Sequence, residues 1–375
     1  MVCQMERIGR NDACWCGSEK KYKKCHLGRD KQERFTRGEA QQVLKLFTTV
    51  SKCSVPDDLK HECQTRIVKA HTLSKGNSLK AISHEGHVLG LKHGFGGLER
   101  NDGRLTLERI GINQASTFTG FCSYHDKELF SCVEDMAFIG TKEQCTMLAY
   151  RPMMREFYVK KANYKVMGKT RDFDRGRSFV EQLAWAKMAQ ENIDGAKLSL
   201  SDLEYLKVRI EDSIKKHSYD CLNHMIINLN EVPAVMACGM HAPIVDIFGN
   251  EIQEITDQKD LRPAYIITNL LALDGNGYMI FSWLPEDDEV ILKFVNSITY
   301  SKLDELGDRL TNYIFTFLEN VFASELWWDS LGEKQERVKD LMMQGVRMHI
   351  YDLSLIKNES YNYNAISVKD FVRIF

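Results

Sequence analysis

The chain has 375 residues and 43% hydrophobic content, enough for two or three domains with apolar cores. Its net charge of -2 excludes a protein that coats nucleic acid over its whole surface. No stretch approaches about eighteen apolar residues and no apolar signal region opens the chain, so we expect a cytoplasmic protein. Its eleven cysteines fit a reducing compartment, where thiols bind metals or fill cores.

Three cysteines and a histidine lie close together near the N-terminus, in the segment IGRNDACWCGSEKKYKKCHLG. Cys14 and Cys16 are one residue apart, and Cys25 and His26 follow after a short connection. Four such soft ligands are typical of a closed, structural Zn²⁺ site. Gly17 permits the sharp turn that the first pair requires. Because so short a segment cannot bury a core, we expect it to fold only with its metal.

The same segment resembles the SEC-C motif, a zinc module found in the bacterial translocase motor SecA and at the ends of other bacterial proteins. The resemblance covers about residues 7–28 and implies docking onto a ribosome or a chaperone. Ala13 and Trp15 stand where prolines are usual, which we expect to loosen the turn. Residues 1–37 carry ten Lys or Arg against five acidic residues. This basic surface also suits nucleic acid, although a merely solvated face is the alternative. The matching residues are Gly9, Arg10, Asn11, Asp12, Cys14, Cys16, Gly17, Ser18, Lys20, Lys21, Tyr22, Lys23, Lys24, Cys25 and His26.

A second set of soft ligands follows a short amphipathic helix predicted over residues 38–51. Two cysteines flank a turn-rich insert, and a C-x2-H pair follows about sixty residues later in TFTGFCSYHDKELF. Two such knuckles joined by a hairpin describe a treble clef. Alternatively, Cys63 is a small buried residue and the later pair begins a helix. The candidate ligands of a second zinc ion are Cys53, Cys63, Cys122 and His125.

Residues 50–130 also resemble a divergent HNH nuclease, a family in which a histidine at a strand end between two zinc knuckles activates water. The resemblance implies His71 as general base, Asp126 as partner of a catalytic divalent metal, and Lys75 as a phosphate contact. His87 is a reserve ligand or third catalytic group. The acid that usually precedes the histidine is absent, and C-x9-C is looser than the usual C-x2-C. A hydrogen-bonded core or turn histidine is the alternative at position 71.

From Lys142 onward, apolar residues recur at helical spacing and predict a helical bundle. The first helix is interrupted at Pro152, and a second covers about residues 176–193. A third begins at Ser201, where Glu204 completes a capping box.

Beyond residue 217 the periodicity is that of strands. The tight-turn sequence at 274–277 predicts a hairpin. We predict an antiparallel meander over residues 218–300, covered by the preceding helices and by a helix from Lys302 to Phe322. The predicted strands lie in HMIINLN, AVMACGM, APIVDIF, AYIITNLLALDGNGYMIFSWL and EVILKFVNSI.

Two further clusters in this region have structural explanations. A tryptophan pair, Trp327 and Trp328, is expected to close a helix–sheet core, with a partner anchor or a base-stacking site as the alternative. The other set is not expected to bind metal, because neighbours along a strand alternate faces. Its members are Cys221, His224, Cys238 and His241.

Together these patterns predict an α+β protein with an N-terminal zinc knuckle, a small segment held by a second zinc, and a helical bundle packed on an antiparallel sheet. The predicted domains are the SEC-C module (1–37), a treble-clef or HNH-like domain (38–140), a helical region (141–217) and the sheet with its covering helices (218–375). The favoured function is that of an intracellular bacterial zinc protein whose basic module docks onto a protein, a ribosome or nucleic acid. The alternatives are a metal-dependent nuclease, such as a phage-defence effector, and a structural protein that oligomerises through its helices.

Overall fold

The computed structural model describes residues 8–45, 52–63, 66–91, 101, 103–255, 261–344, 356 and 361–375. It divides into two compact units, residues 1–51 with 157–204 and residues 52–156 with 205–375. Helices, a large antiparallel sheet and an N-terminal Cys/His cluster confirm the α+β class. The division into four domains stays a prediction. Within the described residues, no helix is long and apolar enough to cross a membrane.

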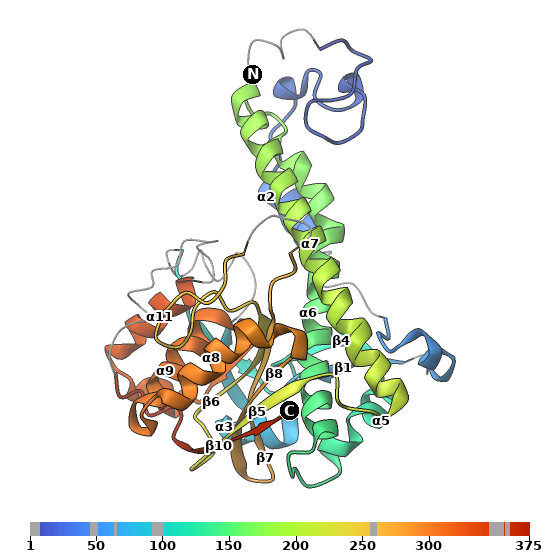
Figure 1. Cartoon of the computed structure of the whole chain (residues 1–375). Coiled ribbons are helices and arrows are strands. Elements are labelled where there is room, and N and C mark those ends of the chain that lie inside the picture. The colour runs from blue at the N-terminus through green and yellow to red at the C-terminus, as the bar shows by residue number, and fades with distance from the viewer. Residues whose placement is uncertain are drawn as a thin grey trace. The chain divides into compact units, whose positions relative to one another are not determined.

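The first unit contains the N-terminal module, the short helix α2 (Arg37–Lys45) and a helical hairpin. The hairpin is made by the second half of α6 (Lys142–Thr170), the turn η6 (Arg171–Asp174) and the first half of α7 (Phe179–Lys216) (Figure 1). The helix predicted over residues 38–51 corresponds to α2, and its last six residues lie outside the described part of the chain.

Helix α7 is continuous, whereas the sequence analysis predicts two helices here. Ser201, the predicted N-cap, lies in its interior. The capping box is instead at Ser178, whose N–H and hydroxyl donate to the Glu181 carboxylate at 2.9 and 2.8 Å. The Glu181 N–H donates back to the Ser178 hydroxyl at 3.4 Å. The prediction was wrong because two Ser-x-x-Glu patterns occur along one helix, and only the first has a free helix end to cap.

In the second unit, strands β1 (Ile67–His71) and β4 (Thr117–Cys122) form a separate antiparallel pair. Helix α5 (Ser123–Glu134) follows β4 without a loop. The rings of Phe121, Phe130 and Tyr150 are almost fully buried against one another, with centroids 5.6–6.5 Å apart. This aromatic cluster packs α5 and the start of α6 against the strand pair.

The large sheet has the strand order β10-β5-β8-β7-β6-β9-β2-β3, and every neighbouring pair is antiparallel. The predicted tight hairpin joins β7 to β8, with Asp274 and Gly275 at φ values of 50° and 78°. The meander order is wrong, because β5 pairs with β8 rather than with β6. The strands are β2 (His87–Leu91), β3 (Leu107–Gly111), β5 (Asn223–Leu229), β6 (Val235–His241), β7 (Ile266–Leu273), β8 (Asn276–Trp283), β9 (Val321–Ala323) and β10 (Val368–Ile374).

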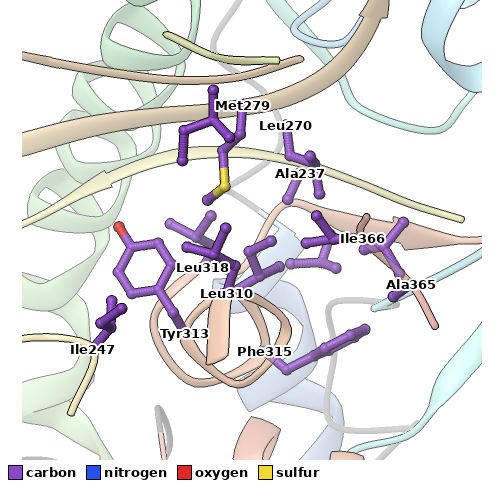
Figure 2. Packing of buried hydrophobic residues seen from close by; sticks show 14 of the residues in the cluster. Ala237, Ile247, Leu270, Met279, Leu310, Tyr313, Phe315, Leu318, Ala365 and Ile366 are labelled. Carbon is purple, nitrogen blue, oxygen red and sulfur yellow. The ribbon is translucent and has the colours of Figure 1, made fainter. Parts of the chain in front are cut away.

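Side chains on the two faces of this sheet pack against different helices. On one face, Ala237, Leu270 and Met279 lie abreast on β6, β7 and β8 and face α9 (Leu303–Phe317) (Figure 2). Buried residues of α8 (Asp288–Tyr300) belong to the same core cluster. On the other, Ile226 and Ile280 lie opposite each other and contact Cys145 on the first half of α6. Because both faces are covered, the strands are apolar throughout rather than alternating.

Three elements near the C-terminal part of the sheet differ from prediction. The segment 289–298, predicted as a strand, is helix α8, and its buried residues have the i, i+3, i+4, i+7 spacing of a helix face. The predicted strand at 242–248 makes only an isolated bridge, between Val245 and Glu251. The helix predicted to end at Phe322 ends at Phe317 because β9 follows it. The buried members of the α8 face are Ile291, Phe294, Val295 and Ile298.

Trp327 and Trp328 lie on the short helix α10 (Glu325–Ser330), and both are 7% exposed. The indole N–H of Trp327 donates to the carbonyl oxygen of Tyr363 at 2.7 Å. These contacts confirm the expected role of the pair in the core. Helix α11 (Lys334–Gln344) packs beside α9.

Pro152 lies inside α6, where a proline has no N–H to donate to the carbonyl oxygen four residues earlier. That oxygen belongs to Leu148. The side chain of Asn269, on β7, donates to it at 3.1 Å. The helix therefore continues through the predicted interruption, because the sheet supplies the missing donor.

Candidate metal centres

The N-terminal cluster is held by a tight local fold. The Cys14 N–H donates to the carbonyl oxygen of Lys20 at 2.8 Å. Gly17 turns the chain with φ +71°, which confirms the turn expected at this glycine. A single 3-10 turn, η1 (Tyr22–Lys24), then places Cys25 and His26 beside the first two cysteines.

The four side chains converge on one point. The Nδ1 atom of His26 is 3.2 Å from the Sγ atoms of both Cys14 and Cys25. The Sγ atoms of Cys16 and Cys25 are 3.5 Å apart. Around a tetrahedral zinc, sulfur and nitrogen ligands lie about 3.6 Å apart and two sulfurs about 3.8 Å apart. The cluster is therefore compatible with zinc after a small expansion, and a metal would bind Nδ1 of the imidazole.

The protonation of the cluster also suits a metal site. Burial raises the pKa of the Cys14 thiol to about 12. Burial would also raise the pKa of Cys16, but hydrogen bonds with His26 and Ser18 lower it to about 6. Burial would lower the pKa of His26, but Asp174 and the Cys16 thiolate raise it to about 9. Zinc must displace the protons that remain on these groups in order to bind.

The family model of the SEC-C motif matches residues 10–28, which include all four ligands. The chain carries a SEC-C motif. No curated protein and no solved structure matches the chain.

Trp15 has a packing role in the SEC-C module. Its ring lies 4.4 Å from the His26 ring and 5.6 Å from the ring of Phe179, at the start of α7. The unusual tryptophan therefore covers a ligand and contacts the hairpin. The sequence predicts a looser turn at this position but not this packing role.

Several charged residues of the SEC-C module are exposed. Tyr22 lies among four exposed lysines, and none of the four forms an ion pair within the described residues. Arg29, by contrast, is 8% exposed and points toward the hairpin. Arg29 is thus buried, whereas the exposed basic residues of the module include Lys20, Lys21, Lys23 and Lys24.

The structure also brings together the four residues of the second predicted set. Cys53 and Cys63 flank the 3-10 segment η4 (Asp57–Glu62), Cys122 ends β4, and His125 lies in the first turn of α5. The Nδ1 atom of His125 is 3.6, 3.6 and 3.2 Å from their respective Sγ atoms. Two of these distances match the spacing of about 3.6 Å expected around zinc, and the third is slightly shorter. The second cluster is therefore also compatible with zinc.

Backbone and burial support this second cluster. The Cys122 N–H donates to the Sγ atom of Cys53 at 3.3 Å, a bond that stabilises a thiolate. Burial raises the pKa of Cys53 to about 12 and lowers that of His125. Among the described residues, the buried Nε2 atom of His125 has no hydrogen-bond partner, and a carboxylate oxygen of Glu62 lies 3.8 Å away.

His71 lies at the end of β1, as predicted, and is hydrogen-bonded. Its Nε2 atom is 3.0 Å from the carbonyl oxygen of Ile112, so Nε2 carries the proton and Nδ1 is left as an acceptor. Burial lowers its pKa. His87 begins β2, where its Nδ1 atom bonds the carbonyl oxygen of Glu85 at 2.8 Å. His87 belongs to neither Cys/His cluster.

Asp126 lies in the first turn of α5, and its charge is close enough to influence the pKa of His71. Burial raises its own pKa. The guanidinium of Arg151 lies 3.6 Å from Asp126 Oδ1 and 2.7 Å from Glu134 Oε1. Lys75 is the first residue of η5 (Lys75–Leu79), the short helical segment that follows β1. Arg151 thus occupies the neighbourhood of the predicted metal-binding carboxylate.

The Cys and His residues of the large sheet have other partners. The His224 ring bonds the Ser282 hydroxyl at 2.8 Å, and the Cys238 sulfur accepts from the Asn320 side chain at 3.0 Å. The Nδ1 atom of His241 lies 3.5 Å from the Tyr313 hydroxyl. The groups of three or more candidate metal ligands in the described part of the chain are the two Cys/His clusters.

The sequence analysis missed Asp174, which lies 148 positions after His26 and accepts a hydrogen bond from it at 2.7 Å. No local pattern marks this aspartate, because it is one of several acidic and basic residues in RDFDRGR. Only the pairing of the module with the hairpin reveals the contact.

Proposed function

We propose that the protein binds zinc in both clusters and uses the SEC-C module to dock onto RNA, as on a ribosome. The observation that carries this proposal is the exposure of Lys20, Lys21, Lys23 and Lys24. Each lysine is a flexible point charge suited to phosphate groups, and none is committed to a carboxylate within the described residues. Tyr22 lies between these lysines in the sequence, but its ring packs against the cluster of Cys14 and Cys16, so the lysines alone carry the proposal.

The charge distribution supports the same partner. The first unit has 20 Lys and Arg against 13 acidic residues, whereas the second has 30 against 39. A polyanion is therefore attracted to the unit that holds the SEC-C module and repelled by the other. The nearly neutral net charge of the chain conceals this division.

The test is binding of the full-length, zinc-loaded protein to a short single-stranded RNA over a series of salt concentrations. Replacing Lys20, Lys23 and Lys24 by alanine should weaken binding. The negative slope of the logarithm of the binding constant against the logarithm of the salt concentration should also become shallower by about 2. Each phosphate contact on a single strand contributes about 0.7 to this slope.

A matched control replaces three exposed lysines of the second unit, Lys127, Lys293 and Lys369, by alanine. It makes the same change in net charge and should leave the slope unchanged. Equal effects of the two variants would show that only net charge matters. Binding to an acidic protein but not to RNA would replace the proposed partner.

A second candidate function, metal-dependent nuclease activity, is favoured by the orientation of His71. Because Nε2–H is held by Ile112, Nδ1 is free to accept a proton from a water that attacks a phosphodiester. The lowered pKa keeps the ring neutral near pH 7. Asp126 would help to hold the divalent metal, in competition with Arg151.

This candidate is tested by incubating the protein with DNA or RNA and Mg²⁺ or Mn²⁺. His71→Ala should reduce the cleavage rate by at least about 100-fold, the usual effect of losing a general base. His61→Ala, at an exposed histidine between Cys53 and Cys63, should cleave at the parental rate. Equal rates for His71→Ala and the parent would exclude His71 as the base.

A further inference from the structure

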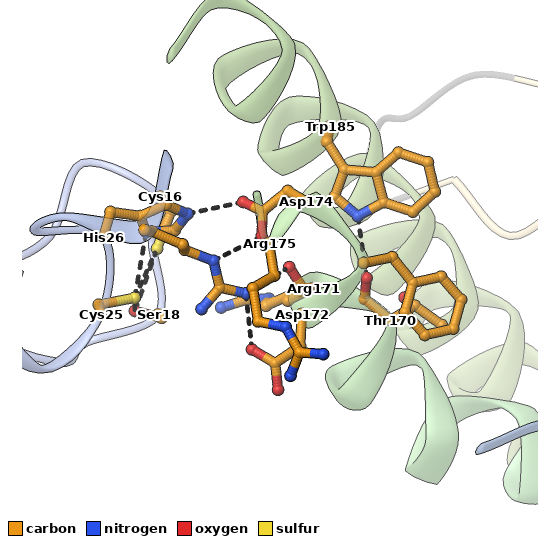
Figure 3. Close-up of polar contacts among 12 residues, drawn as sticks. Cys16, Ser18, Cys25, His26, Thr170, Arg171, Asp172, Asp174, Arg175 and Trp185 are labelled. Carbon is orange, nitrogen blue, oxygen red and sulfur yellow. Dashed lines mark hydrogen bonds and ion pairs between the residues drawn. The ribbon is translucent and has the colours of Figure 1, made fainter. Parts of the chain in front are cut away.

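The two nitrogens of His26 face different partners. Nδ1 faces the thiols of Cys14 and Cys25. Nε2 lies 2.7 Å from Oδ2 of Asp174, on the turn between α6 and α7 (Figure 3). With a metal on Nδ1, Nε2 must carry the proton and donate it to this carboxylate. Such a bond fixes the tautomer and the orientation of a metal-binding imidazole.

The carboxylate of Asp174 is buried and both of its oxygens have partners in the module. Its side chain is 1% exposed, and its other oxygen, Oδ1, accepts from Nε of Arg29 at 2.6 Å. Arg29 also donates to Asp172 at 2.9 Å and to the carbonyl oxygen of Arg171 at 3.3 Å. A buried carboxylate is costly unless it is paired, so Asp174 depends on the module as much as His26 depends on Asp174.

The contacts around this pair join the module to the hairpin along its ligand-bearing side. The Gly176 N–H donates to the carbonyl oxygen of Arg29 at 3.0 Å. Trp15 lies between His26 and Phe179. Ala186, on α7, packs against the cysteines of the site.

We propose that Asp174 is a positioning residue of the SEC-C zinc site and that zinc, by ordering His26 and Trp15, holds the module on the α6–α7 hairpin. The module has no core of its own, so removal of the metal releases these groups and with them the contacts to the hairpin. Because coupling is reciprocal, contacts formed only in the zinc-bound state must also raise the affinity for zinc. The SEC-C module is in this way a zinc-dependent clasp on the hairpin turn. The inference does not depend on RNA binding.

The chain offers a closely matched pair of variants. Asp174→Asn keeps the shape but removes the charge that faces His26. Asp172→Asn makes the same chemical change two residues earlier, at a side chain that is 61% exposed and contacts Arg29 but not His26. The comparison separates an effect on His26 from a general loss of charge in the turn.

The measurement is hydrogen exchange of the full-length protein in a series of zinc buffers, read at peptides that cover residues 10–28. This readout reports the SEC-C site separately from the second cluster. We expect Asp174→Asn to weaken zinc binding by about 10- to 100-fold, the usual effect of losing such a partner, and Asp172→Asn by less than about 3-fold. Equal affinities of the parent and Asp174→Asn would overturn the proposal.

Two further readouts keep the test decisive if Asp174→Asn folds poorly. In the parent, stripping zinc should raise exchange in residues 171–178, and unchanged exchange there would contradict the clasp. In the zinc-loaded protein, the Nε2 proton of His26 should give a downfield, slowly exchanging resonance. This resonance should move in Asp174→Asn but not in Asp172→Asn, and a merely structural role of Asp174 predicts no such signature.

Discussion

Gly176 lies so close to Gln32 that a Cβ atom on the glycine would be 2.6 Å from the Gln32 carbonyl oxygen. Its φ of +73° is also strained for any other residue. We therefore expect Gly176→Ala to weaken the attachment of the module by at least about 2 kcal/mol. Faster hydrogen exchange in residues 10–28 would reveal this loss.

The control is Gly168→Ala, within α6, where a Cβ meets nothing within 4 Å. It should stabilise the helix by about 0.5 to 1 kcal/mol. Similar exchange in the two variants would show that the close approach to Gln32 is not what holds the module.

The N-terminus of α7 offers a second prediction. Ser178→Ala removes the capping box with Glu181 and should cost about 1 kcal/mol of local helix stability. Ser201→Ala, at an exposed position inside the same helix, should be neutral or slightly stabilising, because alanine has the higher helix propensity. Exchange rates of amides near each serine distinguish the two, and an equal cost would place a helix boundary near residue 201.

Zinc content tests both clusters at once. We expect two ions per chain by elemental analysis, falling to one in a Cys53→Ser, Cys122→Ser variant. A Cys14→Ser, Cys25→Ser variant should lose the other ion. If the parent contained one zinc ion per chain and the Cys53→Ser, Cys122→Ser variant retained it, zinc binding by the second cluster would be excluded.

His241 predicts a dependence of stability on pH. Burial lowers its pKa to about 3, whereas in the unfolded chain it is about 6.5. As the pH falls below about 6.5 the unfolded chain takes up a proton that the folded chain refuses, so the free energy of unfolding decreases. Between pH 7 and pH 5 this one group costs about 2 kcal/mol.

His241→Phe retains a ring that stacks on Phe317 and removes the titrating group. We expect urea unfolding of this variant to differ less between pH 7 and pH 5 than that of the parent. His217→Asn, at an exposed residue with φ 49°, is the control and should keep the parental pH dependence. A parental pH dependence in His241→Phe would show that other groups dominate the acid response.

The two Cys/His clusters could be predicted from the sequence because metal-ligand chemistry restricts such sites to few residue types. Cys14 and His26 are local, and even Cys53 and His125, 72 positions apart, stand out as soft ligands in turn-rich sequence. Asp174 could not be predicted, because a carboxylate in a charged turn has many ordinary roles. Its role as a hydrogen-bond partner of His26 is visible only from its burial beside that residue.

The sheet was harder to predict than its strands. The runs that became β5 to β8 were recognised by their apolar composition, yet the order of β5 and β6 depends on long-range pairing that no local signal specifies. The segment 289–298 was assigned to a strand because it is rich in β-branched residues. It forms a helix because its apolar residues are buried along one helical face, and this packing outweighs the β propensity of its residues.

The pair formed by Pro152 and Asn269 sets the position of a helix along a sheet. If α6 were shifted by one turn relative to the strands, Asn269 would face a carbonyl oxygen that already accepts a hydrogen bond within the helix. The carbonyl oxygen of Leu148 would then have no hydrogen-bond donor, which is unfavourable in the interior. Misaligned packings of helix and sheet are thereby penalised during folding. The proline inside the helix thus fixes the register of α6 relative to the sheet, and Pro152→Ala would remove this constraint.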